Sequence, residues 1–489
     1  MSPADDAIRQ IDWRFLLPDP MPRVVAVTAA ADARRVTDGF RRLGAEVVEV
    51  AEAVGGPGGH IDMVFVATAA PGAIRSGLGL RAPDGAIVVQ TTSRRARLLV
   101  ALRLRRARLD VRQYGCWPSC ASATRYVPLD DRAALTTNAR AAKNRRRRAV
   151  GTLLARWGLG SLLFREATLV ATGHRGDCAG PFRVAFGDEV PGTLTLLTPR
   201  FGSSRHVIAM CSDARGGGLV VKTPRCPGDD VQIAREAIGL ASVHGPRPSR
   251  PVLVADTERF GQRWLVQTRL DGLPLTRRDV ADDPARWLVA AREWLDHMPV
   301  EPRSAPDEDG RSERLIRPAL AVAAACADRE PDLRRLVDDG AAAFDRVRST
   351  PLPVVAEHGD FRPPNLLIGG PDAIGVVDWE LAERCGLPFH DLAFFHAFVL
   401  EVAPHLRAEV RAHGSDALRS IGVAPDLFDA LRSLAMLRQL ANLIDRGTGT
   451  TATRAPAIAR SDVARAWFAD LDDRTEGQRR DDANTQVAP

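Results

Sequence analysis

The residues best suited to chemistry lie in one short stretch of the C-terminal third. His358 and Asp360 follow an apolar run, Asn365 comes five residues after Asp360, and Asp378 follows the next apolar run. Carboxylate and amide oxygens are ligands that Mg²⁺ takes in proteins, usually beside substrate phosphates. A second carboxylate can accept the proton of an attacking hydroxyl, even as a weak base, because phosphoryl transfer depends mostly on positioning and charge stabilisation. The set therefore favours magnesium-dependent phosphoryl transfer.

The segment between these polar residues predicts a β-hairpin. Its first strand begins at Leu366, its turn is residues 369–372, and its second strand is residues 374–377. A hairpin holds the start of one strand beside the end of the other, so Asn365 and Asp378 are expected to lie close together. The alternative is a surface hairpin with solvated polar ends, which the joint pattern disfavours.

The pattern His-Gly-Asp, four residues, Asn, and then Val-Asp-Trp-Glu resembles the signature of the aminoglycoside phosphotransferase and choline kinase family. The resemblance covers the C-terminal two-thirds of the chain and implies a kinase-like fold with ATP and Mg²⁺ as cofactors. It implies that Asp360 is the catalytic base and that Asn365 and Asp378 bind the metal. His358 would brace the catalytic loop through hydrogen bonds, and Asp391, in His-Asp-Leu-Ala, would support it.

Lysine is nearly absent from this chain. Lysine and arginine together number 67, and only Lys143 and Lys222 are lysines. A lysine kept in such a composition is a candidate for chemistry that arginine cannot perform. The resemblance implies that Lys222, at the end of a strand, reaches the ATP phosphates and pairs with a helix glutamate. Glu236 is the candidate, because it lies beside a predicted buried helix stripe (Ile233, Ala237, Leu240). The alternatives are an exposed strand lysine and a solvated glutamate.

Two further segments resemble nucleotide-binding parts of the family. The first joins two expected strands and resembles the phosphate-covering loop, where small residues let backbone N–H groups approach the nucleotide; its candidates are Gly202, Ser203 and Ser204. A plain hairpin turn explains that segment equally well. The second resembles the interlobe hinge, whose backbone would bind adenine; its candidates are Val266, Gln267 and Thr268.

The partner is expected to be a small molecule with a hydroxyl group. Its pocket should come from helices within residues 284–348 and after Asp391. Acidic residues are frequent in the first stretch, and in the family acidic patches bind cationic aminoglycosides, but a solvated loop explains them as well. Aminoglycosides, choline-like alcohols, sugars and amino-alcohols all stay open as acceptors.

Residues 12–172 alternate strand-like and helix-like segments, which predicts an α/β domain with a Rossmann-like parallel sheet. The expected strands are residues 23–28, 45–50, 61–67 and 86–90, with later ones at 109–114 and 166–172. The pattern weakly resembles a class I S-adenosylmethionine methyltransferase-like domain. The turn after the first strand lacks the glycines that let backbone approach that cofactor. We therefore interpret this part as degenerate and non-catalytic, serving docking, oligomerisation or substrate presentation.

The remaining chain is divided by composition. A linker is expected at residues 173–192, because glycine and proline are frequent there. A bilobal α+β kinase-like domain is expected over residues 193–472, with lobes at about 193–270 and 271–472. The polar residues 473–489 are expected to form a disordered tail.

Charge is uneven along the chain. Residues 1–170 hold 27 Arg and Lys against 15 Asp and Glu, with basic runs at 94–108 and 143–148, whereas the whole chain carries +6. Such runs suit nucleic acid or an anionic membrane. We favour solvated helix faces, without nucleic acid or membrane partners, because no aromatic residues alternate with the basic ones for base stacking.

Other features of the sequence suggest a cytoplasmic protein. No apolar run approaches the roughly 20 residues that span a bilayer, and the N-terminus does not resemble a signal peptide. Seven scattered cysteines do not suggest a disulfide framework. Cys116 and Cys120 are interpreted as buried thiols rather than zinc ligands.

Three functions are consistent with these patterns. The first is a small-molecule kinase, favoured because every expected polar residue is present. The second is a nucleotide-binding pseudokinase or scaffold. The third is a methyltransferase regulated by its kinase-like half, which the missing glycine-rich turn disfavours.

Overall fold

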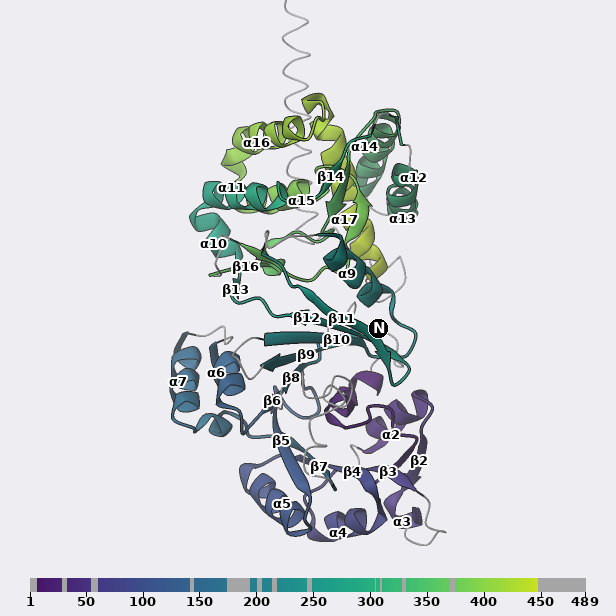
Figure 1. The fold of residues 1–489 in the computed structure, drawn as a ribbon, viewed down its shortest axis with the longest axis vertical. Helices are drawn as coiled ribbons and strands as arrows, with labels where there is room; N and C mark the ends of the chain where they lie inside the picture. The colour runs from purple at the N-terminus through teal and green to yellow at the C-terminus, as the bar shows by residue number, and fades with distance from the viewer. Residues whose placement is uncertain are drawn as a thin grey trace, which may run out of the picture. The chain divides into compact units, whose positions relative to one another are not determined.

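The computed structural model describes residues 7–28, 33–53, 60–140, 145–173, 194–199, 205–212, 218–243, 249–303, 305–307, 310–327, 331–369 and 374–446. The chain divides into two compact units (Figure 1). Unit 1 is Met1–Ile233 with Val254–Arg269, and unit 2 is Ala234–Leu253 with Leu270–Pro489.

Unit 1 is organised around one sheet of twelve described strands. Their order across the sheet is β11-β12-β10-β9-β8-β6-β5-β7-β4-β3-β1-β2. The strands are β1 (Val24–Val27), β2 (Glu46–Glu49), β3 (Ile61–Val66), β4 (Arg81–Thr91), β5 (Asp110–Trp117), β6 (Arg125–Pro128), β7 (Ala167–Thr172), β8 (Leu194–Leu197), β9 (His206–Ser212), β10 (Gly218–Pro224), β11 (Leu253–Arg259) and β12 (Gln262–Thr268).

The first four strands are parallel neighbours in the order β2-β1-β3-β4. They correspond to the four strands expected from the apolar runs, and their residues are mostly buried because helices cover a parallel sheet. β7 then lies antiparallel between β4 and β5. The helices of this part are α2 (Ala33–Arg42), α3 (Val50–Ala53), α4 (Pro71–Leu80), α5 (Arg94–Arg106), α6 (Arg132–Arg140) and α7 (Arg145–Arg156), with 3-10 turns η1 (Asp12–Leu16) and η2 (Gly160–Leu163).

The sheet continues without a break into the strands expected to form the nucleotide-binding lobe. β6 pairs antiparallel with β8 at Tyr126 and Leu196, and β8, β9, β10 and β12 follow as antiparallel neighbours. Residues 174–193, which include most of the expected linker, lie outside the described residues. The strands on either side of that segment therefore belong to one sheet.

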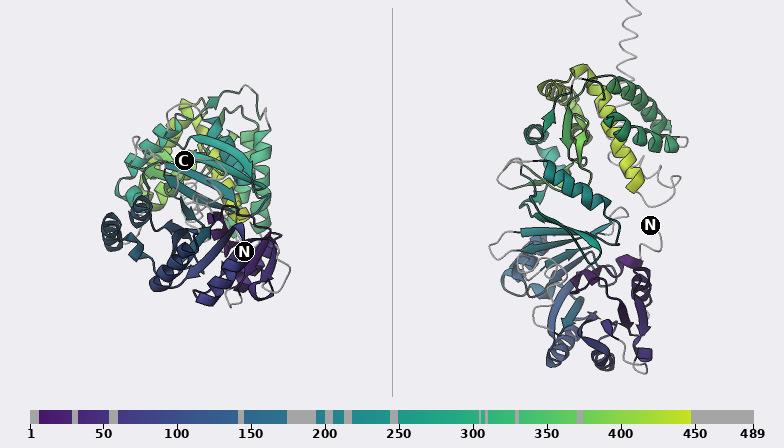
Figure 2. Two further views of the ribbon diagram at one scale, coloured as in Figure 1. Left: turned by 60° about the horizontal axis from the view of Figure 1, so that its bottom comes forward. Right: turned by 45° about the vertical axis from the view of Figure 1, so that its right-hand side comes forward.

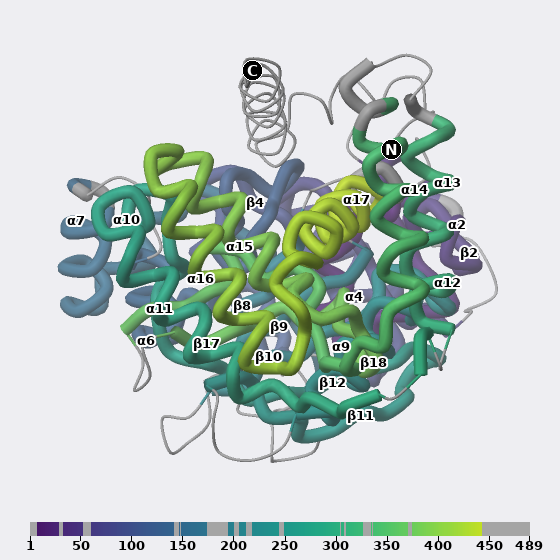
Figure 3. The backbone as a smooth tube through the Cα atoms, turned by 90° about the horizontal axis from the view of Figure 1, so that it is seen from above, coloured from purple at the N-terminus to yellow at the C-terminus, as the bar shows by residue number. Residues whose placement is uncertain are grey.

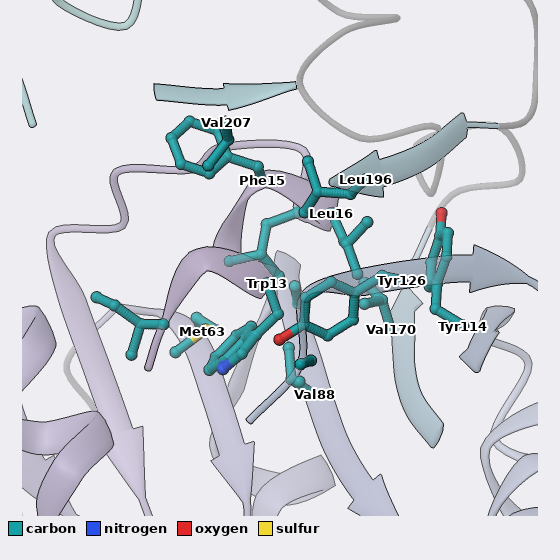
Figure 4. Close-up of a cluster of buried hydrophobic side chains, with 14 of the residues drawn as sticks. Trp13, Phe15, Leu16, Met63, Val88, Tyr114, Tyr126, Val170, Leu196 and Val207 are labelled. Carbon is teal, nitrogen blue, oxygen red and sulfur yellow. The ribbon is translucent and has the colours of Figure 1, made fainter. Parts of the chain in front are cut away.

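A single hydrophobic core also joins the two halves of unit 1. Figure 4 shows Trp13, Phe15 and Leu16 of η1 near Leu196 and Val207, which come from the antiparallel strands. The Trp13 ring stacks on Phe65 of β3 at 5.3 Å, and Phe15 meets Trp264 of β12 edge-on at 6.3 Å. The η1 segment therefore links the parallel strands to the antiparallel ones.

Cys116 and Cys120 are buried thiols whose sulfurs lie 3.2 Å apart. The hydrogen bond with Cys116 and burial both raise the pKa of Cys120. No group of three or more His, Cys, Asp or Glu suited to a metal occurs in the described part of the chain. Their burial agrees with the interpretation of both cysteines as buried thiols.

Unit 2 is mainly helical, with two small three-stranded sheets in the orders β13-β16-β17 and β14-β15-β18. Their strands are β13 (Leu273–Pro274), β14 (Val300–Glu301), β15 (Val354–Glu357), β16 (Leu366–Ile368), β17 (Gly375–Val376) and β18 (Glu383–Gly386). Its helices are α9 (Val231–Ser242), α10 (Arg277–Asp282), α11 (Pro284–Leu295), α12 (Arg311–Leu315), α13 (Arg317–Ala327), α14 (Pro331–Arg348), α15 (His390–Val402), α16 (Arg407–Ser420) and α17 (Phe428–Arg446). The long helices α14 and α17 pack together with α13 beside them (Figure 2 and Figure 3). No described helix is both long and apolar enough to cross a bilayer.

The core of unit 2 anchors the loop that carries the candidate catalytic residues. Phe361, in that loop, packs against Trp294 of α11 at 5.5 Å and Phe395 of α15 at 6.0 Å. Trp379, directly after Asp378, lies 6.0 Å from Trp294. These aromatic side chains are buried, so the polar residues between them extend from a rigid base.

Candidate active site

The candidate catalytic loop follows β15 (Val354–Glu357) and begins with a turn that requires glycine. Gly359 has a φ of +79°, a conformation that residues with a Cβ adopt rarely. A Cβ at this position would lie 2.2 Å from the carbonyl oxygen of Leu381. The glycine therefore lets the loop pass close to the segment that follows Asp378.

Asp391, near the start of α15, stabilises the tight turn at Gly359. Its carboxylate accepts hydrogen bonds from the backbone N–H groups of His358 at 2.6 Å and Gly359 at 2.9 Å. Burial alone would raise the pKa of Asp391, but the contacts with His390 and His358 lower it below its ordinary value. The side chain is therefore an ionised acceptor at neutral pH. From α17, Gln439 donates to the carbonyl of Gly359 at 2.5 Å.

The His358 ring connects the loop to the hairpin. Its Nδ1 accepts the backbone N–H of Asp360 at 3.2 Å, and its Nε2 lies 3.0 Å from the carbonyl oxygen of Val377. An acceptor at Nδ1 and a carbonyl at Nε2 require the neutral tautomer with its proton on Nε2. The ring is fully buried and meets Trp379 edge-on at 4.9 Å. His358 thus contacts both the loop that carries Asp360 and the segment that precedes Asp378.

Asp360 and Asn365 are directly hydrogen-bonded. Asn365 Nδ2 donates to the carbonyl oxygen of Asp360 at 2.9 Å and to its Oδ2 at 3.0 Å. Arg362 Nε lies 2.9 Å from Asp360 Oδ1. Because the amide nitrogen must face the two acceptors of Asp360, the amide oxygen of Asn365 points away from that carboxylate.

The expected hairpin is present and brings Asp378 next to Asn365. β16 (Leu366–Ile368) pairs antiparallel with β17 (Gly375–Val376), and the N–H of Val377 donates to the carbonyl of Asn365 at 3.0 Å. Asp378 follows immediately, half-buried, with a φ of +70°. A positive φ is uncommon outside glycine and often marks functional sites.

Glu236 lies on the buried side of α9. It is 1% exposed, and its neighbours Ile233, Ala237 and Leu240 form the buried stripe predicted from their spacing. A Cβ on Gly239 would lie 2.3 Å from the Cβ of Ala382. The absence of a side chain at this point lets α9 approach the segment after Asp378.

Unit 1 holds the other expected nucleotide-binding residues on two adjacent strands. Lys222, in β10, is 4% exposed and pairs with Leu265 of β12. Val266, Gln267 and Thr268 continue β12 opposite the preceding residues of β10. Gly202, Ser203 and Ser204 lie outside the described residues. The structure thus groups Lys222 with the expected hinge, and groups Asp360, Asn365, Asp378, His358 and Asp391 in unit 2.

Several contacts around the loop were not anticipated from the sequence. Arg362 lies inside the motif, two residues after Asp360, so the sequence itself placed this ion-pair partner close to Asp360. Gln439 carried no local signal, because it comes from α17, about 80 residues away. Glu357 is a third case: its carboxylate lies 2.5 Å from Arg438 and accepts the N–H of Leu387 at 3.0 Å. These buried groups hold β15 against α17.

The residues of unit 2 fit a magnesium–phosphate complex better than a metal bound by protein alone. Asn365 offers an amide oxygen and Asp378 a carboxylate, and Mg²⁺ usually takes one or two such ligands together with phosphates and water. The described residues include no group of three metal-binding side chains. Oxygens of a bound nucleotide would therefore have to complete the shell.

Comparison with protein families gives one match, which covers less than half of the chain. Residues 209–423 match the model of the family described as "Phosphotransferase enzyme family". The match includes β10 with Lys222, the candidate catalytic loop, the hairpin and Asp391. This part of the chain is therefore similar to phosphotransferases.

Three solved structures similar to this chain are aminoglycoside or macrolide phosphotransferases. Aminoglycoside phosphotransferase APH(4)-Ia is 16% identical, with 58% of this chain and 97% of that chain covered and a TM-score of 0.37. Macrolide 2'-phosphotransferase MphH from Brachybacterium faecium is 17% identical, with coverages of 57% and 94% and a TM-score of 0.39. Aminoglycoside phosphotransferase APH(3'')-Id from Streptomyces rimosus, in complex with ADP and streptomycin, is 17% identical, with coverages of 46% and 90% and a TM-score of 0.32. No curated protein matched.

Proposed function

We propose that the protein is an ATP- and Mg²⁺-dependent phosphotransferase that moves the γ-phosphate of ATP to a hydroxyl of a small molecule. One observation carries the proposal: a buried carboxylate, Asp360, is hydrogen-bonded to the side chain of Asn365, and the residue before Asp378, Val377, donates a backbone hydrogen bond to the carbonyl of Asn365. The match of residues 209–423 to the phosphotransferase family supports the same assignment.

Asp360 is assigned as the catalytic base. The acceptor hydroxyl attacks the γ-phosphorus, the bond from that phosphorus to the β–γ bridging oxygen breaks, and ADP leaves. The hydroxyl proton passes to the carboxylate of Asp360. Asn365 donates a hydrogen bond to Oδ2 of Asp360, and the guanidinium of Arg362 forms an ion pair with Oδ1. These two contacts orient the carboxylate.

Asn365 and Asp378 are assigned as the magnesium ligands, and bound Mg²⁺ would neutralise phosphate charge. Lys222 is assigned to the nucleotide phosphates with Glu236 as its partner, and the backbone of Val266, Gln267 and Thr268 to adenine. The burial of Lys222 and Glu236 supports these roles, because buried charged groups are normally paired. Gly202, Ser203 and Ser204 are proposed to cover the phosphates.

The acceptor is proposed to be an aminoglycoside-, choline- or sugar-like alcohol. The residues expected to form its pocket lie in unit 2, on α11 to α14 and beyond Asp391. Among the similar structures, one of APH(4)-Ia contains hygromycin B and one of APH(3'')-Id contains streptomycin. A panel of aminoglycosides, macrolides, choline and simple sugars is therefore the first set of acceptors to test.

The N-terminal part of unit 1 is proposed to be a non-catalytic relative of methyltransferase-like domains. The parallel order β2-β1-β3-β4, followed by an antiparallel strand between two others, supports this resemblance. The turn after β1 includes residues 29–32, which lie outside the described residues. Titration with S-adenosylmethionine tests the alternative, since tight binding would favour a cofactor-dependent enzyme.

The decisive experiment separates nucleotide binding from phosphate transfer. Asp360→Asn should bind Mg²⁺–ATP like the wild-type protein but lose transfer by about 10²–10⁴-fold, the usual contribution of a general base. Asp378→Ala should instead weaken the binding of Mg²⁺–ATP. Asp345→Asn, an exposed site on α14, is the matched control. Wild-type transfer by Asp360→Asn would refute the base assignment, and ATP binding without turnover on any acceptor would favour the pseudokinase.

A further inference from the structure

Two helices of unit 1 carry the basic runs of the sequence. α5 has the sequence RRARLLVALRLRR and α7 has RRRRAVGTLLAR, so neither contains an acidic residue. Solvated helices normally mix both signs of charge and keep apolar residues on the covered side. The distribution of apolar residues on these two helices departs from that rule.

The solvent-facing side of α5 is apolar at its centre. Leu98, Leu99 and Leu102 are 63%, 54% and 47% exposed. Exposed arginine pairs precede and follow them on the same face: Arg94, Arg95, Arg105 and Arg106. The opposite side is buried, at Arg97, Val100, Ala101 and Leu104. These three leucines therefore do not belong to the buried core, and exposed arginines lie before and after them along the helix.

The solvent-facing side of α7 and the turn after it repeat the pattern. Val150, Leu153 and Trp157 follow each other at i, i+3 and i+7 and are 56%, 48% and 68% exposed. Leu159 and Leu162 are 43% and 42% exposed. Exposed arginines accompany them at positions 146, 148 and 156.

The start of α5 contacts the 3-10 turn that follows α7. The guanidinium of Arg94, at the start of α5, donates to the carbonyl of Leu162 in η2, and Arg97 donates to that of Phe164 at 3.4 Å. In Figure 1, α7 lies at the left-hand edge of unit 1 and α5 lies at its lower edge. Of the sixteen large apolar residues that are exposed in the described part of the chain, eight belong to these segments. We call these eight, with the arginines around them, the leucine–arginine surface.

We propose that the leucine–arginine surface binds an anionic phospholipid membrane. Guanidinium groups pair with phosphates, and each cation near an anionic leaflet contributes about 1 kcal/mol to binding. Leucine and tryptophan favour the boundary between headgroups and acyl chains, as in helices that lie on membranes. This is peripheral attachment and needs no spanning helix.

Charge and composition argue against a second copy of the chain, and against nucleic acid, as the partner of this surface. A second copy that presented the same surface would oppose arginines with arginines across the contact. Nucleic acid would neutralise the arginines but leave the leucines exposed, since its grooves and phosphates are polar. A membrane interface offers phosphates to the arginines and an apolar layer to the leucines. The sequence favoured solvated helix faces here, because it did not reveal which side of each helix the leucines occupy.

Cosedimentation of the full chain with vesicles tests this proposal. The vesicles are phosphatidylcholine alone, or phosphatidylcholine with one third phosphatidylglycerol. The wild-type protein should bind the anionic vesicles and lose binding as salt increases. The triple change Leu98→Gln, Leu99→Gln and Leu102→Gln, at exposed positions, should weaken binding by about tenfold or more. Arg95→Glu with Arg106→Glu should weaken it by a similar factor.

The matched control is the triple change Val252→Gln, Val254→Gln and Val289→Gln, at valines that are 54%, 51% and 52% exposed elsewhere. It should bind like the wild-type protein. Unchanged binding by the leucine variant, or equal binding to neutral vesicles, would overturn the proposal. Binding to duplex DNA or RNA but not to vesicles would assign the surface to nucleic acid. Loss of a dimer in the leucine variant, without vesicle binding by the wild type, would assign it to a second copy.

Discussion

Arg225 donates a hydrogen bond from Nε to Oδ2 of Asp12 at 2.9 Å, across 213 residues of sequence. Both side chains are buried, and Arg225 also donates to the carbonyl of Pro199 at 2.5 Å. Arg14 donates to the carbonyl of Arg225. Burial lowers the pKa of Arg14 to about 10, and the charge of Asp12 opposes that shift. These contacts attach η1 to the end of the strand that carries Lys222.

Asp12→Asn should therefore destabilise the protein by about 3 kcal/mol, because it leaves two buried guanidinium groups without their carboxylate. The change should also raise the KM for ATP, since β10 ends at Pro224, next to Arg225. Denaturant unfolding and steady-state kinetics measure the two effects. Asp282→Asn, in the exposed pair with Arg278, is the control and should stay within about 0.5 kcal/mol. A similar small effect for Asp12→Asn would show that η1 does not hold the strand.

Lys222→Arg should reduce kcat/KM by on the order of 10–100-fold although it keeps the charge. A guanidinium is planar and larger than an ammonium, so it cannot take the same buried place as a point charge beside phosphates. Activity assays at saturating acceptor measure the effect. Lys143→Arg, the other lysine of the chain, should leave kcat/KM unchanged. Wild-type kinetics for Lys222→Arg would mean that any cation suffices at this position.

Gly359→Ala should cost more stability than its backbone conformation alone explains. A residue with a Cβ at positive φ costs about 1–2 kcal/mol, and here the Cβ would also lie 2.2 Å from the carbonyl oxygen of Leu381. Gly422→Ala is the matched control, with a φ of +75° and no atom within 4 Å of the added Cβ. Chemical denaturation should give a loss of roughly 3 kcal/mol or more for Gly359→Ala against about 1 for the control. Equal losses would mean that the loop relaxes freely.

Stability should fall below pH 6.5 because of a buried histidine pair. His396 Nε2 lies 3.1 Å from His413 Nδ1, and burial, with His413, Arg432 and Arg292 nearby, lowers the pKa of His396 well below its ordinary value. Burial and Arg292 also lower the pKa of His413, which Asp416 and Asp296 partly oppose.

The unfolded chain therefore takes up these protons before the folded protein does. The stability is fully present above about pH 6.5 and is lost as pH falls from there towards the lowered folded pKa values, by up to about 1.4 kcal/mol per pH unit for each histidine. Unfolding curves between pH 7.5 and 5.5 measure the slope, and His396→Gln should reduce it. A slope that His396→Gln leaves unchanged would exclude His396 as its source.

Local patterns predicted most elements that carry the candidate site. The hairpin between Asn365 and Asp378, the buried stripe of α9 and the strand of Lys222 all occur where the spacing placed them. Each of these elements depends largely on residues close in sequence. Such elements can be predicted from the spacing of apolar residues or from the residue types of a turn. The partners Gln439 and Arg438 left none, because they reach the loop from α17 through tertiary packing.

The sequence by itself determined which residues are candidates for chemistry, namely one polar motif and two lysines, and it predicted the alternating strands and helices of the N-terminal part. Only the tertiary structure decided that this part and the strand of Lys222 share one sheet and one core, and that leucines of α5 face solvent. The reason is physical. Strand pairing across a long insertion and the outward side of a helix depend on what the chain packs against, and packing joins residues that no local period relates.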